Sequence, residues 1–248
     1  MNISIYQAAS AMDAHARWHE VIAGNLSAAS VPGFKKAELR MAAVEGGTLP
    51  GAEGGDGNKT FTIPKAETTY DLSPGPLART SAHTDIAIGG EGFFEVALPS
   101  GENGYTRDGE FKLNEEGFLV TKQGYQVLGE DGPIQFDKPG TFEVSATGTV
   151  TQAGVEIDNN FRLVNFLKPS DLSPIGNGVF TRKNQQLEPE QIEDPEFRQG
   201  FIEKSNVSTI EEMAKLIQVT RAYESNQRVI QNHDQRTERT LQELGQPV

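Results

Sequence analysis

His15 and His19 are the first residues whose types and spacing could do chemistry, because they lie one helical turn apart in the chain. Two imidazoles at this spacing on one helix face can hold a zinc ion. A third ligand is not apparent nearby, since Glu20 falls on another face of the same helix. A polar position in a helix seam or an assembly contact is the favoured interpretation, and we expect no metal site.

Ser81, His83 and Asp85 carry the residue types of a nucleophilic triad. A triad needs a base that reaches the nucleophile and a third group that orients the base from its other side. Three alternate positions of one short segment are too close together to converge in this way. We interpret the segment as the entry to a strand and predict no catalytic residues.

Three further segments of glycines and acids are candidates for a phosphate or a calcium site. Gly89-Gly90-Glu91-Gly92 lacks the six-position pattern and the following helix of a dinucleotide site. Asp56-Gly57-Asn58 and Asp131-Gly132 offer oxygens to calcium but lack the alternating acids of a calcium loop. All three segments are typical of turns, and we expect no cofactor.

The composition excludes several function classes. The 248 residues include 22 basic and 35 acidic side chains, a net charge of −13, and no cysteine. A Lys/Arg surplus for phosphate contacts is absent, so we expect no nucleic-acid partner. Disulfides, thiol nucleophiles and cysteine-based zinc sites are impossible. No window approaches 18 consecutive apolar residues, which argues against membrane insertion, and the first 25 residues lack the layout of a secretory signal peptide.

A helix is predicted at each end of the chain. Within residues 1–30, a seam recurs at alternating spacings of three and four, as in a heptad repeat; its members are Ile5, Ala8, Met12, His15, His19, Ile22 and Leu26. The helix should end between Ser27 and Ser30, because Pro32 disfavours helical geometry at the residue before it. The same alternation continues over residues 205–248; its members are Met213, Leu216, Thr220, Tyr223, Gln227, Ile230, Asp234, Thr237, Leu241 and Leu244.

The middle of the chain has a different pattern. Residues 31–83 are rich in Gly and Pro and are predicted to form an extended arm or linker with at most one strand. From residue 84 to 204, short alternating apolar segments are separated by turn sequences, which predicts an antiparallel β-domain, barrel-like or sandwich-like. The fold class is thus mixed and mainly β, with terminal α-helices that pair as a coiled-coil core.

Both helical seams are incomplete. His15, Thr220, Gln227 and Asp234 are poor core residues for a single chain. A helix that cannot bury a satisfactory face alone usually finds one on a partner chain. We therefore predict one discontinuous helical domain from residues 1–30 and 205–248 that pairs with itself and with neighbouring subunits and carries the β-domain.

Three segments together resemble bacterial flagellar axial proteins, the rod and hook proteins. The first segment is NLSAASVPGFKK, in which Asn25, Leu26, Gly33, Phe34 and Lys35 match the family pattern and Ala28 replaces a family Asn. The second is DIAIGGEGFFEV, continued by YTRDGEFKLNEEGFLVTKQGYQVLGEDGPI. The third is EKSNVSTIEEMAKLIQVTRAYESNQRVIQNHD. The resemblance spans nearly the whole chain in the right order.

The resemblance implies a structural subunit of the flagellar basal-body rod that is needed for motility. In this family the terminal helices form an inner tube, and subunits pass unfolded through the type III export apparatus to assemble in the periplasm without a cleaved signal peptide. The implied partners are other rod subunits, copies of the same chain and the export apparatus. The short arm resembles the proximal rod proteins, with the distal rod or hook proteins as the alternative.

The expected assembly interface combines the helical seams with Phe34, interpreted as the anchor of an arm that leaves the helical core. Its members are Ile5, Met12, Ile22, Leu26, Phe34, Met213, Leu216, Tyr223, Ile230 and Leu241. A second interpretation is a secreted oligomeric β-type binding module. It would need clustered exposed aromatic residues, whereas the one tryptophan, Trp18, lies in the first helix.

Overall fold

A computed structural model describes residues 3–49, 59–136, 140–166, 168, 171–184, 186 and 188–244. Two helices stand at the ends of the element order. The elements are α1 (Ile3–Ser27), β1 (Ala37–Leu49), β2 (Lys59–Tyr70), β3 (Leu77–Arg79), β4 (Ile86–Ile88), β5 (Phe93–Ala97), β6 (Asn103–Thr106), β7 (Lys112–Leu113), β8 (Leu119–Val120), β9 (Gln126–Gly129), β10 (Gly132–Pro133), β11 (Phe142–Val144), β12 (Val150–Gln152), β13 (Val155–Glu156), β14 (Leu163–Asn165), β15 (Leu172–Gly176), β16 (Val179–Arg182), β17 (Glu190–Gln191), β18 (Phe197–Gln199), β19 (Phe201–Glu203) and α2 (Thr209–Leu244).

The chain divides into two compact units. Unit 1 consists of Met1–Leu26, Ala37–Thr69 and Thr209–Val248, and unit 2 of Ser27–Lys36 and Tyr70–Ser208. Each unit is therefore built from segments that lie far apart in the sequence. The mainly β composition and the two terminal helices confirm these parts of the predicted fold class.

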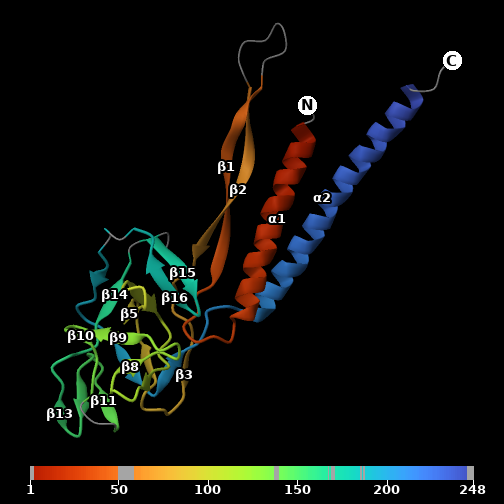
Figure 1. Cartoon of the computed structure of the whole chain (residues 1–248). Helices are drawn as coiled ribbons and strands as arrows, with labels where there is room; N and C mark the ends of the chain where they lie inside the picture. Colours follow the sequence, from red (N-terminus) through yellow and green to blue (C-terminus); the bar gives the residue numbers. More distant parts are fainter. Residues whose placement is uncertain are drawn as a thin grey trace. The chain divides into compact units, whose positions relative to one another are not determined.

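Unit 1 contains both helices and the β1–β2 pair. The helices α1 and α2 lie side by side and run in opposite directions (Figure 1). Helix α1 ends at Ser27, as predicted, because the Pro32-Gly33 segment that follows redirects the chain. Strands β1 and β2 form a two-stranded sheet where the sequence predicted an arm with at most one strand. The arm prediction missed this pairing, by which each strand satisfies backbone groups of the other.

The buried face of α2 differs from the predicted seam by one residue. Glu212 and Val219 are buried and Asn226 and His233 half-buried, at intervals of seven residues. The predicted seam positions one residue further on, including Met213 and Thr220, are exposed. Two seam members, Leu216 and Ile230, are half-buried, so the two faces overlap in part. The seam as a contact with other subunits stays a prediction. Glu212 lies on the face that is covered within the chain, where a polar residue is acceptable only with hydrogen-bond partners.

Unit 2 is built on antiparallel strands (Figure 1). The main sheet follows the order β15-β16-β6-β5-β9-β8-β7, with β10, β14 and β17 attached beside this path, and the smaller sheets are β11-β12-β13, β18-β4 and β19-β3. Among the described strands, no ladder joins β15 to β7, so the sheet does not close and the predicted barrel is wrong. Very short strands such as β7 and β8 do not supply the continuous staggered pairing that closure requires.

The core of unit 2 is aromatic. Phe94 is fully buried and contacts the rings of Phe111, Phe161 and Phe197. A smaller cluster joins Phe93 to Phe166 and Phe180. Adjacent Phe93 and Phe94 serve different clusters because successive strand residues point to opposite faces.

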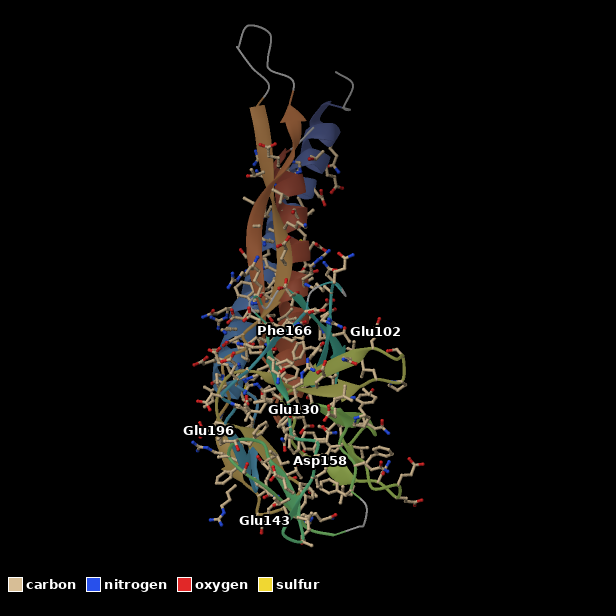
Figure 2. The ribbon with its side chains drawn as sticks, turned by 90° about the vertical axis from the view of Figure 1, so that its left-hand side faces the viewer. Glu102, Glu130, Glu143, Asp158, Phe166 and Glu196 are labelled. Carbon is tan, nitrogen blue, oxygen red and sulfur yellow. The ribbon has the colours of Figure 1, made fainter. Side chains whose placement is uncertain are left out.

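Many acidic side chains of unit 2 lie on its surface, although Asp85, Glu95, Asp108 and Glu203 are buried. The labelled acids of Figure 2 are exposed, and the labelled Phe166 is buried; the acids are Glu102, Glu130, Glu143, Asp158 and Glu196. The surface of this unit therefore contributes to the negative charge that argued against a nucleic-acid partner.

Candidate functional site

A buried ion cluster in unit 2 joins residues from the three segments that carry the family resemblance. Glu203 accepts hydrogen bonds from Lys35 Nζ at 2.7 Å and from Arg107 Nη1 at 3.0 Å. The side chains of all three residues are at most 1% exposed. We call Lys35, Arg107 and Glu203 the Glu203 cluster.

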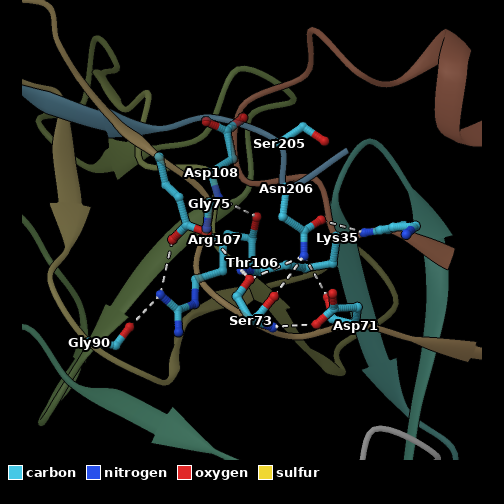
Figure 3. Close-up of polar contacts among 12 residues, drawn as sticks. Lys35, Asp71, Ser73, Gly75, Gly90, Thr106, Arg107, Asp108, Ser205 and Asn206 are labelled. Atoms are coloured by element: carbon cyan, nitrogen blue, oxygen red, sulfur yellow. Dashed lines mark hydrogen bonds and ion pairs between the residues drawn. The ribbon is translucent and has the colours of Figure 1, made fainter. Parts of the chain in front are cut away.

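Backbone groups add further hydrogen bonds to the Glu203 cluster (Figure 3). Within the described structure, the buried Nε of Arg107 has no hydrogen-bond partner. Lys35 Nζ also donates to the carbonyl of Ser73, and Arg107 Nη1 to the carbonyl of Gly90. Gly75 N–H donates to the Glu203 carboxylate at 2.8 Å. Because buried charges are tolerated only when they are paired and hydrogen-bonded, these contacts allow the cluster to exist in the interior.

The charges of the Glu203 cluster are unequal, with two cations facing one carboxylate. Burial lowers the pKa of Lys35 and of Arg107, and the nearby Glu203 carboxylate opposes this shift in both cases. Arg107 also lies with its guanidinium 5.4 Å from the centre of the Phe93 ring, which favours a cation. Glu203 is the carboxylate that pairs directly with both cations, whereas Asp71 attracts Lys35 and Glu91 attracts Arg107 more weakly. Loss of the Glu203 charge would leave both buried cations without a directly bonded carboxylate.

Asn206 holds the chain beside this cluster (Figure 3). Its Oδ1 accepts a hydrogen bond from Lys36 N–H at 2.8 Å, and its Nδ2 donates to the carbonyls of Asp71 and Ser73. The N–H of Gly33 donates to the carbonyl of Glu203. The chain that follows α1 and the chain that precedes α2 are thereby fastened to one place on unit 2.

A second polar cluster lies in unit 1. Asn25 is buried near the end of α1, and its side chain makes two hydrogen bonds to the backbone N–H and C=O of Ala37. Its Nδ2 also donates to buried Glu212 in the first turn of α2, and Glu212 accepts a further bond from Lys215. Asn25 thus links α1, β1 and α2 within this unit.

Asp108, next to Arg107, is a buried carboxyl whose pKa is raised to about 6, first of all by burial. The folded state therefore binds its proton more tightly than the unfolded state. The contribution of this carboxyl group to the free energy of unfolding is therefore fully present below about pH 4 and is lost as the pH rises through about 6. At pH 7 the ionised carboxylate is a net cost to folding.

We expect Asp108→Asn to raise the free energy of unfolding at pH 7 by about 1–3 kcal/mol, since one pKa unit corresponds to about 1.4 kcal/mol. Asparagine keeps the oxygen that accepts the Glu110 N–H bond. Urea unfolding of both proteins at about pH 4 and pH 7 measures the effect, with Glu115→Gln as an exposed control. An equal difference at both pH values would contradict the assignment.

The structure gives the two histidines of α1 different surroundings. His15 is half-buried with its ring 6.4 Å from that of Trp18, and His19 is exposed. Both line a groove with Val219 and Tyr223 of α2. Among the described residues, no three His, Asp or Glu side chains are grouped so that they could hold a metal ion.

The residues of the suspected triad have separate structural contacts. His83 lies against the Phe142 ring, and Asp85 forms an isolated β-bridge with Glu110. Ser81 has a positive φ of 66° and donates its N–H to the carbonyl of Gly200. None of these contacts connects a nucleophile to a base.

The glycine and acidic segments that the structure describes are turns. Gly92 has a φ of 108° directly before β5, and the Gly90 carbonyl is the acceptor for Arg107. Gly132 has a φ of 111°, and the N–H of Asp131 donates to Asn159 Oδ1. The Asp56-Gly57-Asn58 segment lies outside the described residues.

The predicted assembly residues fall into groups by exposure. Met213 and Tyr223 are exposed, and Ile22 is buried within unit 1. The half-buried members are Met12, Leu26, Phe34, Leu216 and Ile230. The side chains of Ile5 and Leu241 lie outside the described part of the structure.

The sequence interpretation missed the two polar clusters, although their residues stood inside the quoted motifs. Lys35, Arg107 and Glu203 were matched to a family pattern without a role. One feature of the sequence could have indicated the Glu203 cluster. Each of the three motifs contains a charged residue among apolar residues and glycines, and the three residues include both positive and negative charges. Which charges meet was not deducible, because partners such as Lys35 and Glu203 are 168 positions apart.

The geometry defines a structural class of protein. The buried charged groups of the two clusters are used in internal ion pairs and hydrogen bonds. Of the exposed large apolar side chains in the described structure, five lie on α2, namely Ile210, Met213, Ile217, Tyr223 and Val229, and three lie on strands, namely Met41, Val155 and Ile175. The spacing of Ile210, Met213 and Ile217 places them on one helix face, and adjacent exposed apolar side chains are typical of a surface that meets another protein.

Comparison with known proteins agrees with this class. Residues 87–173 match the flagellar hook protein FlgE/F/G D1 domain, and residues 198–243 match the flagellar basal body rod FlgEFG protein C-terminal domain. The chain is similar to the flagellar basal-body rod protein FlgF of Caulobacter vibrioides, with 31% identity over 231 residues and 91% of each chain covered.

Two further relatives are similar over almost their whole length. FlgF of Rhizobium meliloti is 31% identical over 254 residues, with 99% of each chain covered. FlgG of Buchnera aphidicola subsp. Schizaphis graminum is 30% identical over 269 residues, with 98% of each covered. The chain therefore belongs to the family of flagellar basal-body rod proteins, structural proteins of the flagellar basal body, as the resemblance predicted.

Neither of the two described helices is both long and apolar enough to cross a membrane. Helix α2 is the longer of the two, and its exposed apolar residues alternate with charged ones such as Arg221 and Glu224.

Proposed function

We propose that this chain is a rod subunit that polymerises helically through α1 and α2, with its β-rich unit 2 carried on the helices. The observation that carries the proposal is the set of exposed apolar side chains on α2, within the region of the C-terminal family match. In a single chain these groups remain in water, and burial against helices of other subunits removes them from it. Coiled-coil pairing, export without a cleaved signal peptide and assembly in the periplasm are parts of this proposal, as are contacts with other rod subunits.

We further propose the proximal rod type over the distal type. The alignment with the Rhizobium FlgF has 254 positions against 248 residues in the chain, which leaves room for few gaps. The alignment with the Buchnera FlgG needs 269 positions at similar coverage. Imaging of basal bodies that carry a labelled copy of this chain would test the position along the rod.

Two matched double variants test the assembly surface. Met213→Asp with Tyr223→Asp places two charges on predicted assembly residues that are exposed in the single chain. We expect folding to be unchanged and incorporation into basal bodies, and with it swimming, to be lost. Gln218→Asp with Ser225→Asp adds the same charge at exposed polar positions of α2 and should leave both nearly unchanged.

The readouts are circular dichroism of the purified chain, immunoblotting of isolated basal bodies and swimming motility, with the variants replacing the natural copy. Normal incorporation of the Met213/Tyr223 variant would contradict the assembly surface. A wild-type chain that is absent from basal bodies would contradict the rod function itself.

A further inference from the structure

The chain contains two Asn–Gly pairs, Asn103-Gly104 and Asn177-Gly178. An asparagine followed by glycine is prone to lose its side-chain amide without an enzyme. Glycine has no Cβ, so its backbone nitrogen is unhindered and its conformation is free to change. That nitrogen can then reach the side-chain carbonyl carbon of the residue before it. The two pairs have different surroundings in unit 2, and these surroundings decide which pair can react.

Asn177-Gly178 is the turn of a hairpin. It joins β15 to β16 (Figure 1), and the flanking Gly176 and Val179 are paired across it. Asn177 has a φ of 52° and Gly178 a φ of 73°, as in the two-residue turns that favour Asn-Gly. The side chain of Asn177 is exposed and makes no hydrogen bond to another described residue. Its amide is therefore not held away from the next backbone nitrogen.

Asn103-Gly104, in contrast, is held in place. Asn103 is half-buried at the start of β6, and its Nδ2 donates to the buried Glu95 carboxylate at 2.8 Å. Both residues of the pair lie in register with β5. A Cβ at Gly104 would lie only 3.0 Å from Val179 Cγ1, so this part of the strand is closely packed. The backbone rotation that the reaction needs would require the main sheet to open here.

We propose that Asn177 is a site of spontaneous deamidation and that the sheet protects Asn103. The Gly178 nitrogen attacks Cγ of Asn177 and forms a C–N bond. The Cγ–Nδ2 bond breaks, and the side-chain amide group leaves as ammonia with the proton of the Gly178 nitrogen. Water then opens the cyclic imide. Attack at Cγ gives aspartate, and attack at the main-chain carbonyl gives isoaspartate, in which the chain runs through the side chain.

The change at Asn177 extends into the interior of unit 2 through Gly178. The Gly178 carbonyl accepts a hydrogen bond from Thr106 Oγ1 at 3.1 Å, and the same Oγ1 accepts one from Asp108 N–H at 3.0 Å. Isoaspartate adds a carbon atom to the backbone of a turn whose length fixes the register of its strands. It therefore moves Gly178 away from Thr106 and weakens the hairpin of β15 and β16.

Ageing of the purified full chain tests the site. The protein is kept at neutral pH for several weeks and digested, and chromatography with mass spectrometry separates peptides that contain asparagine, aspartate or isoaspartate. We expect conversion at Asn177 to exceed that at Asn103 by at least about tenfold. Each factor of ten needs only about 1.4 kcal/mol of additional opening free energy at the protected site.

The unfolded chain is the matched reference. In concentrated guanidinium chloride both pairs are released from the structure and should convert at similar rates. Equal conversion of Asn177 and Asn103 in the folded protein would overturn the proposal. Survival of Asn177 in the folded protein, while both pairs convert in the denaturant, would overturn it as well.

Asn177→Gly tests the consequence for stability. Glycine keeps the positive φ of the turn and has no amide to lose. After ageing, we expect the urea midpoint of unit 2, followed by the tyrosine circular dichroism, to fall for the wild type and to stay constant for Asn177→Gly. A constant wild-type midpoint despite isoaspartate, or an equal fall in both proteins, would contradict the weakening of the hairpin. The inference is independent of the proposed rod function, because its tests use the isolated chain.

Discussion

Glu203→Gln is expected to lower the free energy of unfolding of unit 2 by about 3–5 kcal/mol, the cost typical of removing one partner from a buried ion pair. Glutamine has nearly the shape of glutamate but no charge. Lys35 and Arg107 would then face each other's positive charge in the interior with no carboxylate between them. A loss of this size is a large share of the stability of an ordinary domain.

The aromatic residues allow the two units to be followed separately. Tyr70, Tyr105 and Tyr125 lie in unit 2, so near-ultraviolet circular dichroism during urea unfolding reports largely on its packing. Trp18, the one tryptophan, reports on α1 by fluorescence. We expect the first signal to move to lower urea in Glu203→Gln.

Two further variants define the cause of the effect. Glu196→Gln breaks an exposed pair with Arg198 and should change stability by less than about 1 kcal/mol. Lys35→Met removes one of the two cations and leaves Glu203 paired with Arg107, so its cost should be well below that of Glu203→Gln. Equal losses from Lys35→Met and Glu203→Gln would contradict the unequal charge balance of the cluster.

Gly33→Ala is the second large expected effect, a loss of roughly 3–5 kcal/mol from backbone strain and overpacking together. Gly33 has a φ of 67°, which an alanine adopts only at a cost. A Cβ at this position would lie 2.2 Å from Asp108 N and 2.3 Å from Arg107 C. Both atoms belong to the backbone and cannot rotate away.

The neighbouring helix offers a matched control. Gly24 lies inside α1, and a Cβ there would meet nothing within 4 Å. Gly24→Ala should therefore stabilise the helix by up to about 1 kcal/mol. Urea unfolding followed by the tyrosine signal measures Gly33→Ala, and the Trp18 signal measures Gly24→Ala. A Gly33→Ala protein as stable as the wild type would show that residues 32–34 do not pack against Arg107 and Asp108.

Gly33→Ala should also have a local effect on unit 2. Because Gly33 and Lys35 fasten the chain that follows α1 to unit 2, Gly33→Ala should loosen this attachment. Hydrogen exchange of residues 93–97 in buried β5 gives an independent measure, since its amides open only when the main sheet opens.

Local pattern was sufficient for the helices and for much of the turn chemistry. The alternating spacings predicted both terminal helices, and the geometry of the X-Pro bond predicted the end of α1 within a residue or two. The turn interpretation of Gly89–Gly92 and Asp131–Gly132 also followed from local sequence. These features depend on residues within a few positions of one another, which is the range over which propensity and steric rules act.

Long-range partners were outside that range. The sequence did not indicate that Lys35, Arg107 and Glu203 share one buried site, or that Asn25 meets Glu212. It also placed the α2 seam on Met213 and Thr220, one residue away from the buried face. The sequence did not indicate that Glu212 is buried, because its burial depends on hydrogen bonds from Asn25 and Lys215.

The sequence by itself thus determined the family, the terminal helices and the antiparallel β region, because each is written in short motifs or in local periodicity. The tertiary structure alone decided which charges are paired, which face of α2 is covered and which of its apolar side chains stand exposed. The physical reason is that a buried charge or an apolar face acquires its free energy from neighbours far away in the chain, and those neighbours are fixed only when the chain folds.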